Sequence, residues 1–410
     1  MPEGATTKRQ LWVRVAALIV LAIALWLAIS VSFANIARRG NPDLVLRLRP
    51  DDAMAQTIKA DRLLSPDASR ARLDEAERLA RGAIARDPTN ARSFRVLAFI
   101  TTLRGQDRRA EPQFRYAAEL SRRDLPTQLW LIDHYVAENN AEGALDHFGT
   151  ALTTAPESGE VLFPILVKAS SDENLVAPLA SFLRQPRPWR DALLAKIAIE
   201  GPSGRTVDRL FRRLERSGLE LEPTVAAALI NRLVNERAFQ AALHHYSAAT
   251  GGRPPSLIRN GSFNAPPKFA PLDWELLDTG DAGAYVVPRA GDPSEGQLEF
   301  TSSAGGSATL ARQLVVAPAG DYVLRSRGRL YDAGSDAAPL WSIRCDQATR
   351  PLARLPTLEA GEDWQVQAVR LSIPATGCPA LWLSLDLPDR RVGATVSGAI
   401  DRVELVPSGR

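Results

Sequence analysis

Histidines, cysteines and carboxylates are the residues of this chain that could carry acid–base, nucleophilic or metal chemistry. No histidine stands at metal-ligand spacing from a cysteine or from a second histidine; the four are His134, His147, His244 and His245. No histidine follows residue 256, so a Ser-His-Asp triad cannot form in that part of the chain. The sequence also lacks a Gly-x-Ser-x-Gly elbow, a phosphate-binding loop and a dinucleotide fingerprint. We therefore predict a protein that is not an enzyme and has no catalytic cofactor.

Carboxylates leave one enzymatic alternative open. Glycosidases work with a pair of acids, and Asp273, Glu275 and Glu362 could supply such a pair. Acidic residues are plentiful in most chains, so their presence alone does not indicate catalysis. A glycosidase is therefore kept as an alternative and is not the prediction.

The two cysteines, Cys345 and Cys378, lie in the same C-terminal region. A pair confined to one exported β domain indicates a disulfide, and a disulfide indicates an oxidising compartment. Neighbouring strands of a sandwich would bring the two Cα atoms within the roughly 4.4–6.8 Å that a disulfide needs. Two buried free thiols are the alternative.

An apolar run near the N-terminus bears on the location of the whole chain. Residues 15–33 carry no charge, and a helix of this length, at about 1.5 Å per residue, spans the hydrocarbon core of a bilayer. A cleaved signal peptide is the alternative, because Ser32 and Ala34 form a small-x-small site. We predict an inner-membrane protein with periplasmic C-terminal domains, divided into a cytoplasmic tail 1–14, a transmembrane anchor 15–34 and a linker 35–50.

Charge and composition restrict the partners. The chain has 50 basic and 47 acidic residues, a net charge of +3, and no basic block. This balance gives no indication of nucleic-acid binding. The expected partners are one or more proteins, a polysaccharide and, through residues 15–33, the membrane.

A spacing of 34 residues recurs in the middle of the chain. Its members are Ala76, Ala80 and Ala83, then Ala110, Phe114 and Ala117, then Ala144, Phe148 and Ala151. A fixed period of this length is typical of stacked helical hairpins that bury one another's apolar faces. The pattern resembles the second-helix core of tetratricopeptide repeats. We therefore predict an α-solenoid of such hairpins over residues 51–250.

The resemblance to tetratricopeptide repeats implies a protein-binding groove lined by the first helix of each hairpin. The groove positions in this sequence are Arg92, Arg95, Phe99, Asp133, Asn231 and Asn235. Their mixed polar character favours a polar peptide or protein as the partner. A solvated helix face is the alternative for each of them.

Residues 251–256 separate the helices from a region of different texture. Two glycines and two prolines in this linker end the helical pattern. Residues 257–407 then alternate apolar and polar side chains between short turns, which predicts an antiparallel β-sandwich. On this pattern Trp341, Ile343 and Cys345 share one strand face.

Two segments of this β region resemble jelly-roll carbohydrate-binding modules. Residues 260–263, Asn-Gly-Ser-Phe, followed by Asp273 and Trp274, resemble the opening of those modules, and residues 399–405 resemble their closing strand. The resemblance implies a jelly roll with Trp274 and Tyr285 as glycan-contact candidates. It also implies Asp401 as a ligand of a structural calcium ion. Core packing is the alternative for both aromatic residues, and for Trp274 it is the favoured interpretation.

These observations predict a multidomain α + β chain, with a single transmembrane helix, an α-solenoid and an antiparallel jelly roll. The expected function is a non-catalytic periplasmic scaffold that binds protein through its repeats and glycan through its sandwich, in exopolysaccharide assembly or export. One alternative is a sugar-binding module on a helical spacer, which an exposed aromatic strip would favour. Another is an envelope-protein assembly factor without glycan contact.

Overall fold

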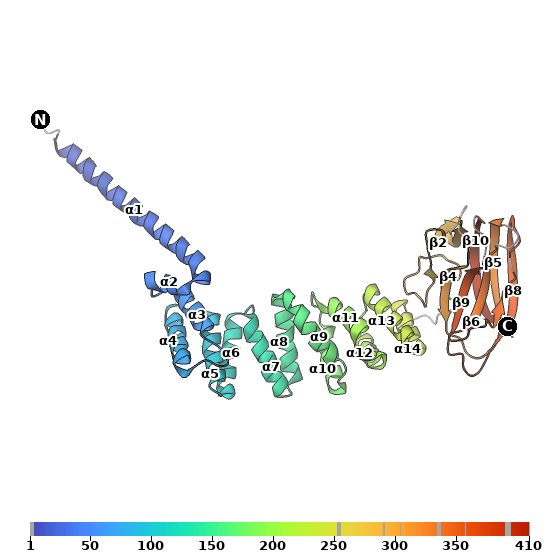
Figure 1. Cartoon of the computed structure of the whole chain (residues 1–410), viewed down its shortest axis with the longest axis horizontal. Helices are drawn as coiled ribbons and strands as arrows, with labels where there is room; N and C mark the ends of the chain where they lie inside the picture. The colour runs from blue at the N-terminus through green and yellow to red at the C-terminus, as the bar shows by residue number, and fades with distance from the viewer. Residues whose placement is uncertain are drawn as a thin grey trace. The chain divides into compact units, whose positions relative to one another are not determined.

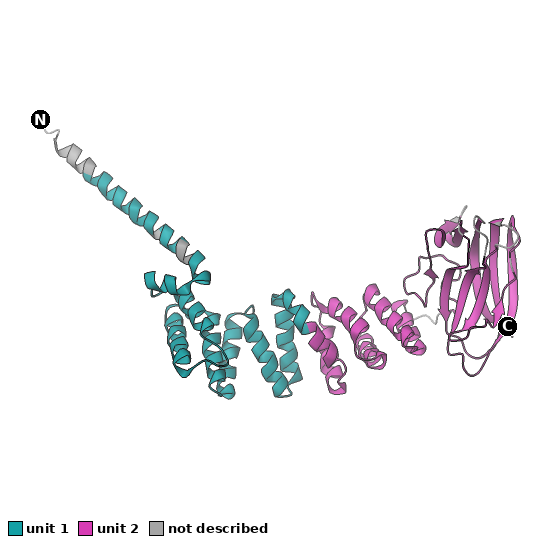
Figure 2. Cartoon of the chain, in the orientation of Figure 1, with its two compact units in different colours: residues 1–162 teal, residues 163–410 magenta. Residues whose placement is uncertain are grey.

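The computed structural model describes residues 4–251, 256–289, 292–303, 305–333, 338–356, 358–389 and 395–409. The chain divides into two compact units, Met1–Leu162 and Phe163–Arg410 (Figure 2). Helices occupy the first unit and the start of the second, and two antiparallel sheets follow them along the chain (Figure 1).

Helix α1 (Gly4–Gly40) contains the apolar run. Within the described part of the chain it is the one helix long and apolar enough to cross a membrane, over Trp12–Gly40, and its apolar window is not buried. Helix occupies most of the predicted linker 35–50. Helix α1 continues to Gly40, and α2 (Pro42–Leu48) begins with Pro42 at its first position, where proline favours a helix start.

The end of α1 and the whole of α2 pack on the helix that follows. Val45 of α2 is buried against Ala55, and Arg38 Nη2 lies 3.1 Å from Asp52 Oδ2. Asp52 also caps the next helix, because its Oδ1 accepts a hydrogen bond of 2.8 Å from Ala55 N. The apolar helix is thus tied to the first unit by burial and by charge.

The other helices of the first unit pack as consecutive pairs, α3 on α4, α5 on α6 and α7 on α8. Side-chain caps mark several helix starts, among them Ser69, Asn90 and Asn140. The helices are α3 (Ala53–Arg62), α4 (Arg70–Arg86), α5 (Ala91–Leu103), α6 (Asp107–Leu120), α7 (Leu125–Ala137) and α8 (Ala141–Thr154), with a 3-10 turn η1 (Pro156–Ser158).

The residues of the 34-residue period lie on α4, α6 and α8, the second helix of each pair. All nine side chains are at most 3% exposed. Phe114, for example, packs with Ala98, Ala110 and Leu131 from three different helices. The 34-residue period is therefore the distance in sequence between equivalent buried positions of successive helix pairs.

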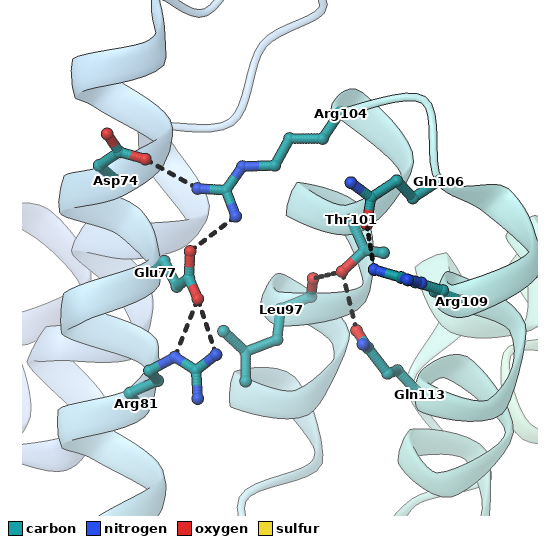
Figure 3. Close-up of polar contacts among 9 residues, drawn as sticks. All are labelled: Asp74, Glu77, Arg81, Leu97, Thr101, Arg104, Gln106, Arg109 and Gln113. Carbon is teal, nitrogen blue, oxygen red and sulfur yellow. Dashed lines mark hydrogen bonds and ion pairs between the residues drawn. The ribbon is translucent and has the colours of Figure 1, made fainter.

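Polar contacts supplement this packing around α4, α5 and α6 (Figure 3). Arg104 follows the last turn of α5 and donates to Glu77 Oε2 at 2.7 Å and to Asp74 Oδ1 at 2.8 Å, both on α4. Hydrogen bonds from Arg81 and then Arg104 hold the pKa of Glu77 below its usual value. The Thr101 hydroxyl donates 3.1 Å to Gln113 Oε1 and so links α5 to α6.

Helix α9 (Gly159–Ala169) runs from the first unit into the second. Among the later helices, some contact the next helix but one and others contact the next helix along the chain. Helix α10 contacts α12, α11 contacts α13, and α13 contacts α14. Their bounds are α10 (Glu173–Arg184), α11 (Arg190–Glu200), α12 (Gly204–Arg216), α13 (Pro223–Asn235) and α14 (Phe239–Ala249).

The strands form two five-stranded sheets whose neighbouring strands are antiparallel. Sheet A has the order β1-β4-β9-β6-β7 and sheet B the order β2-β3-β10-β5-β8. The strands are β1 (Glu275–Leu276), β2 (Ala282–Arg289), β3 (Asp292–Ser302), β4 (Ala308–Val315), β5 (Gly320–Ala333), β6 (Leu340–Cys345), β7 (Ala353–Arg354), β8 (Gly361–Ile373), β9 (Leu381–Leu387) and β10 (Val396–Pro407).

One apolar core joins the two sheets. The predicted strand faces are confirmed, since Trp341, Ile343 and Cys345 all lie in this core, together with the alternate leucines of β9. Strands β6 and β9 are neighbours, with Cys345 opposite Leu381. Cys345 and Cys378 form a disulfide with a Cα–Cα distance of 5.1 Å, so the bond clamps sheet A at one end of β6.

Candidate functional site

Aromatic and charged side chains gather on the outer face of sheet B. Successive side chains of a strand point to opposite faces, and on β5 the buried Leu324, Ser326 and Leu330 point into the core. The side chains at the alternate positions therefore point outward. They belong to Arg325, Arg327, Arg329 and Tyr331. We call this surface the arginine face and define its centre as Arg289, Arg327, Arg329, Tyr331, Trp364 and Asp401.

Strand register places one row of side chains straight across the sheet. Tyr285 of β2 pairs with Glu299 of β3, Glu299 with Ala399 of β10, and Ala399 with Arg329 of β5. Trp364 lies on β8, the strand next to β5. An aromatic ring thus stands on each edge strand of the sheet.

Three guanidinium groups surround Trp364. The guanidinium carbons of Arg289, Arg327 and Arg329 lie 5.7, 5.2 and 4.7 Å from the centre of the indole ring. Arg329 also lies 4.8 Å from the ring of Tyr331. Cations at such distances are attracted to the electron-rich ring face. The arginines are therefore held in place by an aromatic platform.

Asp401 supplies the central carboxylate of the arginine face. Its Oδ2 lies 3.1 Å from Arg327 Nη1 and 3.7 Å from Arg289 Nη1, and its side chain is only 5% exposed. Burial raises the pKa of Asp401 above its usual value, although both arginines oppose that shift. Arg289 also pairs with Glu295. Two of the three arginines thus have carboxylate partners within the protein.

Arg329 differs from its two neighbours. No carboxylate of the described residues lies within 4.0 Å of its guanidinium nitrogens. Its Nε is buried and makes no hydrogen bond. Among the described residues, the close partners of the Arg329 guanidinium are therefore the two aromatic rings.

The residues present do not fit the calcium ion implied for Asp401. Calcium binds several oxygen ligands, whereas the Asp401 carboxylate faces the guanidinium groups of Arg289 and Arg327. These cations would repel a divalent ion at the same oxygen. The charge of Asp401 already holds arginines, so its described contacts do not favour the calcium ion, which stays a prediction.

Trp274 is misassigned as a glycan contact. Its side chain is 1% exposed, its indole N–H donates 3.0 Å to Asn260 O, and its ring packs between Phe263 and Trp341. The opening motif of the domain therefore builds the core. Tyr285 remains accessible at 45% exposure, and its hydroxyl donates 3.0 Å to Asp278 Oδ2, which raises the pKa of Tyr285.

Among the predicted groove residues, Arg95 requires a correction. It is 4% exposed, with Nη2 lying 3.0 Å from Asp61 Oδ2 and Nε 3.1 Å from Asp124 Oδ2. A buried guanidinium needs such partners, so Arg95 joins α3, α5 and α7 and is not available to a ligand. Arg92 and Asp133 are exposed on α5 and α7, and Phe99 is half-buried.

The remaining groove candidates lie on α13 in the second unit. Asn231 and Asn235 are exposed, and Asn235 Nδ2 donates 2.9 Å to Asn231 Oδ1. Both line a cleft of about 680 Å³. Its other lining residues are Ile199, Ala227, Ala228, Arg232, Glu236, Lys268 and Ala270. This cleft brings two of the predicted groove residues to one cavity.

A histidine cluster lies between α12 and α14. Potential ligand atoms of Glu215, His244 and His245 lie within 4.8 Å of one another. However, His245 Nδ1 is 2.7 Å from Glu215 Oε1 and its Nε2 is 2.9 Å from Asp208 Oδ1. Both ring nitrogens already have partners, so the cluster ties two helices together. This cluster was not predicted from the local spacing of residues, because the two carboxylates lie 30 and 37 residues from His245 in the sequence.

The acids kept for a glycosidase have structural contacts. Asp273 is buried and accepts a hydrogen bond of 2.8 Å from Tyr246 Oη and one of 3.0 Å from Lys268 N. Burial raises the pKa of Tyr246 beside it. Glu275 Oε2 lies 2.6 Å from Arg312 Nε. The Glu362 side chain lies outside the described residues.

The sequence interpretation missed the arginine face. Its signal was an arginine at every second position, Arg325, Arg327 and Arg329, in a segment already predicted as strand. Such a period of two places all three on one face. Trp364 gave no local signal, because its partners come from β2 and β5.

No family model matches this chain, and no curated protein matches it. The C-terminal β-sandwich resembles solved structures of carbohydrate-binding modules. One is TmCBM61 in complex with beta-1,4-galactotriose, with 15% identity over 38% of this chain and 100% of that one, at a TM-score of 0.27. Another is a family 16 carbohydrate-binding module, with 22% identity over 37% and 99%, at 0.24.

A third similar structure is the CBM22-1 xylan-binding domain from Paenibacillus barcinonensis Xyn10C. It is 17% identical over 36% of this chain and 94% of its own, at a TM-score of 0.25. At these values the galactotriose and the xylan named for two of these structures are ligands of those proteins alone. The function of the present chain has to be argued from its own residues.

Proposed function

We propose that this chain is a membrane-anchored, non-catalytic protein whose β-sandwich binds polysaccharide on the arginine face. The observation that carries this proposal is the row from Tyr285 on β2 to Arg329 on β5 with Trp364 beside it. Sugar rings present apolar C–H faces that stack on aromatic rings, and hydroxyl groups that bond to charged side chains. The face offers both kinds of group.

A sheet face suits a long ligand better than a small one. Strands lie about 4.8 Å apart, so about 19 Å separates β2 from β8 across five strands. That distance accommodates several sugar rings in sequence. Aromatic rings at the two edges and polar groups between them match an extended chain that crosses the strands.

The helices supply the second part of the proposed function. Their pairing and their buried 34-residue period support tetratricopeptide-like hairpins in an α-solenoid. The cleft beside Asn231 and Asn235 is the proposed protein-binding site. A two-hybrid screen or a pull-down from detergent-solubilised membranes with Asn231→Ala/Asn235→Ala as the matched variant tests it. Identical partners for both proteins would contradict this placement.

The proposed location is the inner membrane, with the helical and β parts in the periplasm. The apolar helix α1 and the disulfide of Cys345 and Cys378 support it. Fusions of alkaline phosphatase and of a green fluorescent protein to the C-terminus test it. Phosphatase activity alone is expected, and fluorescence alone would contradict the orientation.

Two alternatives remain distinct from this proposal. The exposed aromatic residues of sheet B favour a sugar-binding module on a helical spacer over an assembly factor without glycan contact. The spacer alternative differs in having no protein partner. A role in exopolysaccharide assembly or export would require both binding activities in one chain.

Binding of the full chain in detergent to insoluble polysaccharides tests the glycan part. Co-sedimentation with a panel of neutral and acidic polymers should find at least one ligand. Trp364→Ala should abolish that binding, whereas Trp382→Ala on the outer face of sheet A should not. Loss of binding in both variants, or in neither, would contradict the assignment to sheet B.

A further inference from the structure

We propose that the polysaccharide bound by the arginine face is anionic and carries the carboxylates of uronic acids. This inference rests on the proposed glycan binding and names its substrate class. The juxtaposition that carries it is Arg329, held between Trp364 and Tyr331 without a carboxylate partner.

Local charge is the first step. Around Trp364, the guanidinium groups of three arginines meet the carboxylates of Asp401 and Glu295 only. Both carboxylates contact Arg289, and Asp401 also contacts Arg327. One positive charge, that of Arg329, is left without an anion among the described residues.

Hydrogen-bonding capacity is the second step. The Arg329 Nε is withdrawn from water and has no acceptor, and an unmet buried donor is unfavourable by about 1–3 kcal/mol. A ligand cannot reach this withdrawn nitrogen, so an incoming acceptor meets the other donors of the Arg329 guanidinium. A carboxylate accepts from these donors and also neutralises the charge, whereas a sugar hydroxyl does only the first.

Geometry favours a carboxylate over other anions. A guanidinium is a planar fork that binds a planar carboxylate through two parallel hydrogen bonds. Trp364 and Tyr331 fix the position of the Arg329 fork. A single unmet positive charge matches the single charge of a uronate, and a dianionic phosphate monoester would exceed it.

Asp401 defines which arginine is free. Its buried carboxylate holds Arg327 and Arg289, so these two are already paired with carboxylates and stand beside the open position. Arg329 is the expected direct contact, and Arg289 and Arg327 are positioning residues for the ligand and for Trp364.

A pair of polymers that differ only in charge tests this inference. The full chain in detergent is titrated with polygalacturonate and with the same polymer after its carboxylates have been reduced to alcohols. The acidic polymer should bind roughly 10- to 100-fold tighter, as expected for a hydrogen bond to a charged group. Its affinity should also fall as the salt concentration rises from about 50 to 200 mM, because salt screens the attraction between the polymer and the arginines.

Matched variants locate the charge effect. Arg329→Ala should remove the preference for the acidic polymer, and Arg329→Lys should restore only part of it because lysine lacks the fork. Arg312→Ala is the control, since Arg312 also lies over a tryptophan but already bonds to Glu275. Circular dichroism of each variant confirms that it is folded.

The outcomes separate this inference from the proposed function. Equal binding of both polymers, lost in Trp364→Ala, would overturn the anionic substrate class and leave glycan binding intact. A preference for polygalacturonate that survives Arg329→Ala would overturn the role of Arg329. Binding to neither polymer, nor to any acidic polysaccharide in the panel, would overturn this inference, and binding to no polysaccharide would overturn the proposed function as well. Equally tight, Arg329-dependent binding of single-stranded DNA would overturn the choice of polysaccharide.

Discussion

The outer faces of the two sheets each carry an arginine over a tryptophan, but the two arginines differ in their other partners. On sheet A, Arg312 lies 4.8 Å from the ring centre of Trp382. On sheet B, Arg329 lies 4.7 Å from that of Trp364. The arginine of sheet A bonds to Glu275 at 2.6 Å, whereas Arg329 has only aromatic partners among the described residues.

The rest of sheet A follows the same pattern of internal satisfaction. The indole N–H of Trp382 donates 3.0 Å to Asp346 Oδ1. Asp386 accepts hydrogen bonds from Thr309, Ser342 and Ser384 at 2.7–2.8 Å. Buried polar groups with all partners present stabilise a fold. The arginine over the tryptophan of sheet A therefore has a carboxylate partner, whereas the Nε of Arg329 on sheet B has no hydrogen-bond partner among the described residues.

Removing the disulfide should have the largest effect on this comparison, because the bond joins the end of β6 to the turn before β9, and both strands belong to sheet A. Cys345→Ala/Cys378→Ala should destabilise the sandwich by about 2–5 kcal/mol. Hydrogen–deuterium exchange should accelerate in β9 and β6, with α5 as the unchanged control. The variant protein that remains folded should bind polysaccharide on its arginine face as tightly as the unaltered protein does. Weaker binding would show that the outer faces of the two sheets are coupled.

Removing Asp386 comes next. Asp386→Ala leaves the hydroxyls of Thr309, Ser342 and Ser384 without their shared acceptor, which should cost about 1–3 kcal/mol. Denaturant unfolding followed by tryptophan fluorescence measures the loss. Asp332→Ala, at an exposed position of sheet B where the carboxylate bonds to Thr395 only, is the control. Equal losses would remove the contrast between the faces.

The sequence predicted the helices and strands better than it predicted the residues of the candidate site. The 34-residue period and the alternation at Trp341 and Ile343 depend on local spacing, which a sequence shows directly. Arg95 was misplaced because its burial depends on Asp61 and Asp124, which come from other helices. Trp274 was misplaced because a motif shared by folds does not say which aromatic residue faces solvent.

The arginine face could have been found only in part. Alternation predicts that Arg325, Arg327 and Arg329 share a side of one strand. It does not predict that β5 lies between β8 and β10, which is what brings Trp364 and Asp401 to the arginines. Strand order is a property of the whole sheet, so the missing information was topological.

Tyr285 tests whether the ligand crosses the strands. Tyr285→Ala removes the aromatic ring on β2, at the far end of the row, and should weaken binding of a long polymer about three- to tenfold. A short oligosaccharide held at Trp364 should bind unchanged. Isothermal titration with both ligands measures the difference. Equal weakening for the two lengths would place the ligand along the strands.

Asp401 should give the smallest effect, and one of opposite sign. Asp401→Asn keeps the shape but removes the anion that competes for Arg289 and Arg327, so an anionic polymer should bind about two- to fivefold tighter at pH 7. Weaker binding by a folded Asp401→Asn variant would show that the carboxylate aids the ligand.

The pH profile of the unaltered protein provides the companion measurement. Asp401 faces Arg327, Arg289 and Glu295, with Arg402 beside it on β10, and burial raises its pKa. As pH falls toward that raised pKa, the carboxylate becomes neutral and frees its arginines. Affinity should therefore increase as pH falls, and Asp401→Asn should flatten the profile. The same slope in both proteins would contradict this role.

Hydroxyl-radical footprinting of the full chain with polygalacturonate tests the central claim most directly, because it reads both faces in one sample. The account predicts that bound polymer protects Trp364, Tyr331 and Tyr285 from oxidation and leaves Trp382 unchanged. Protection of Trp382, or saturated binding without protection of Trp364, would contradict polysaccharide binding on the arginine face.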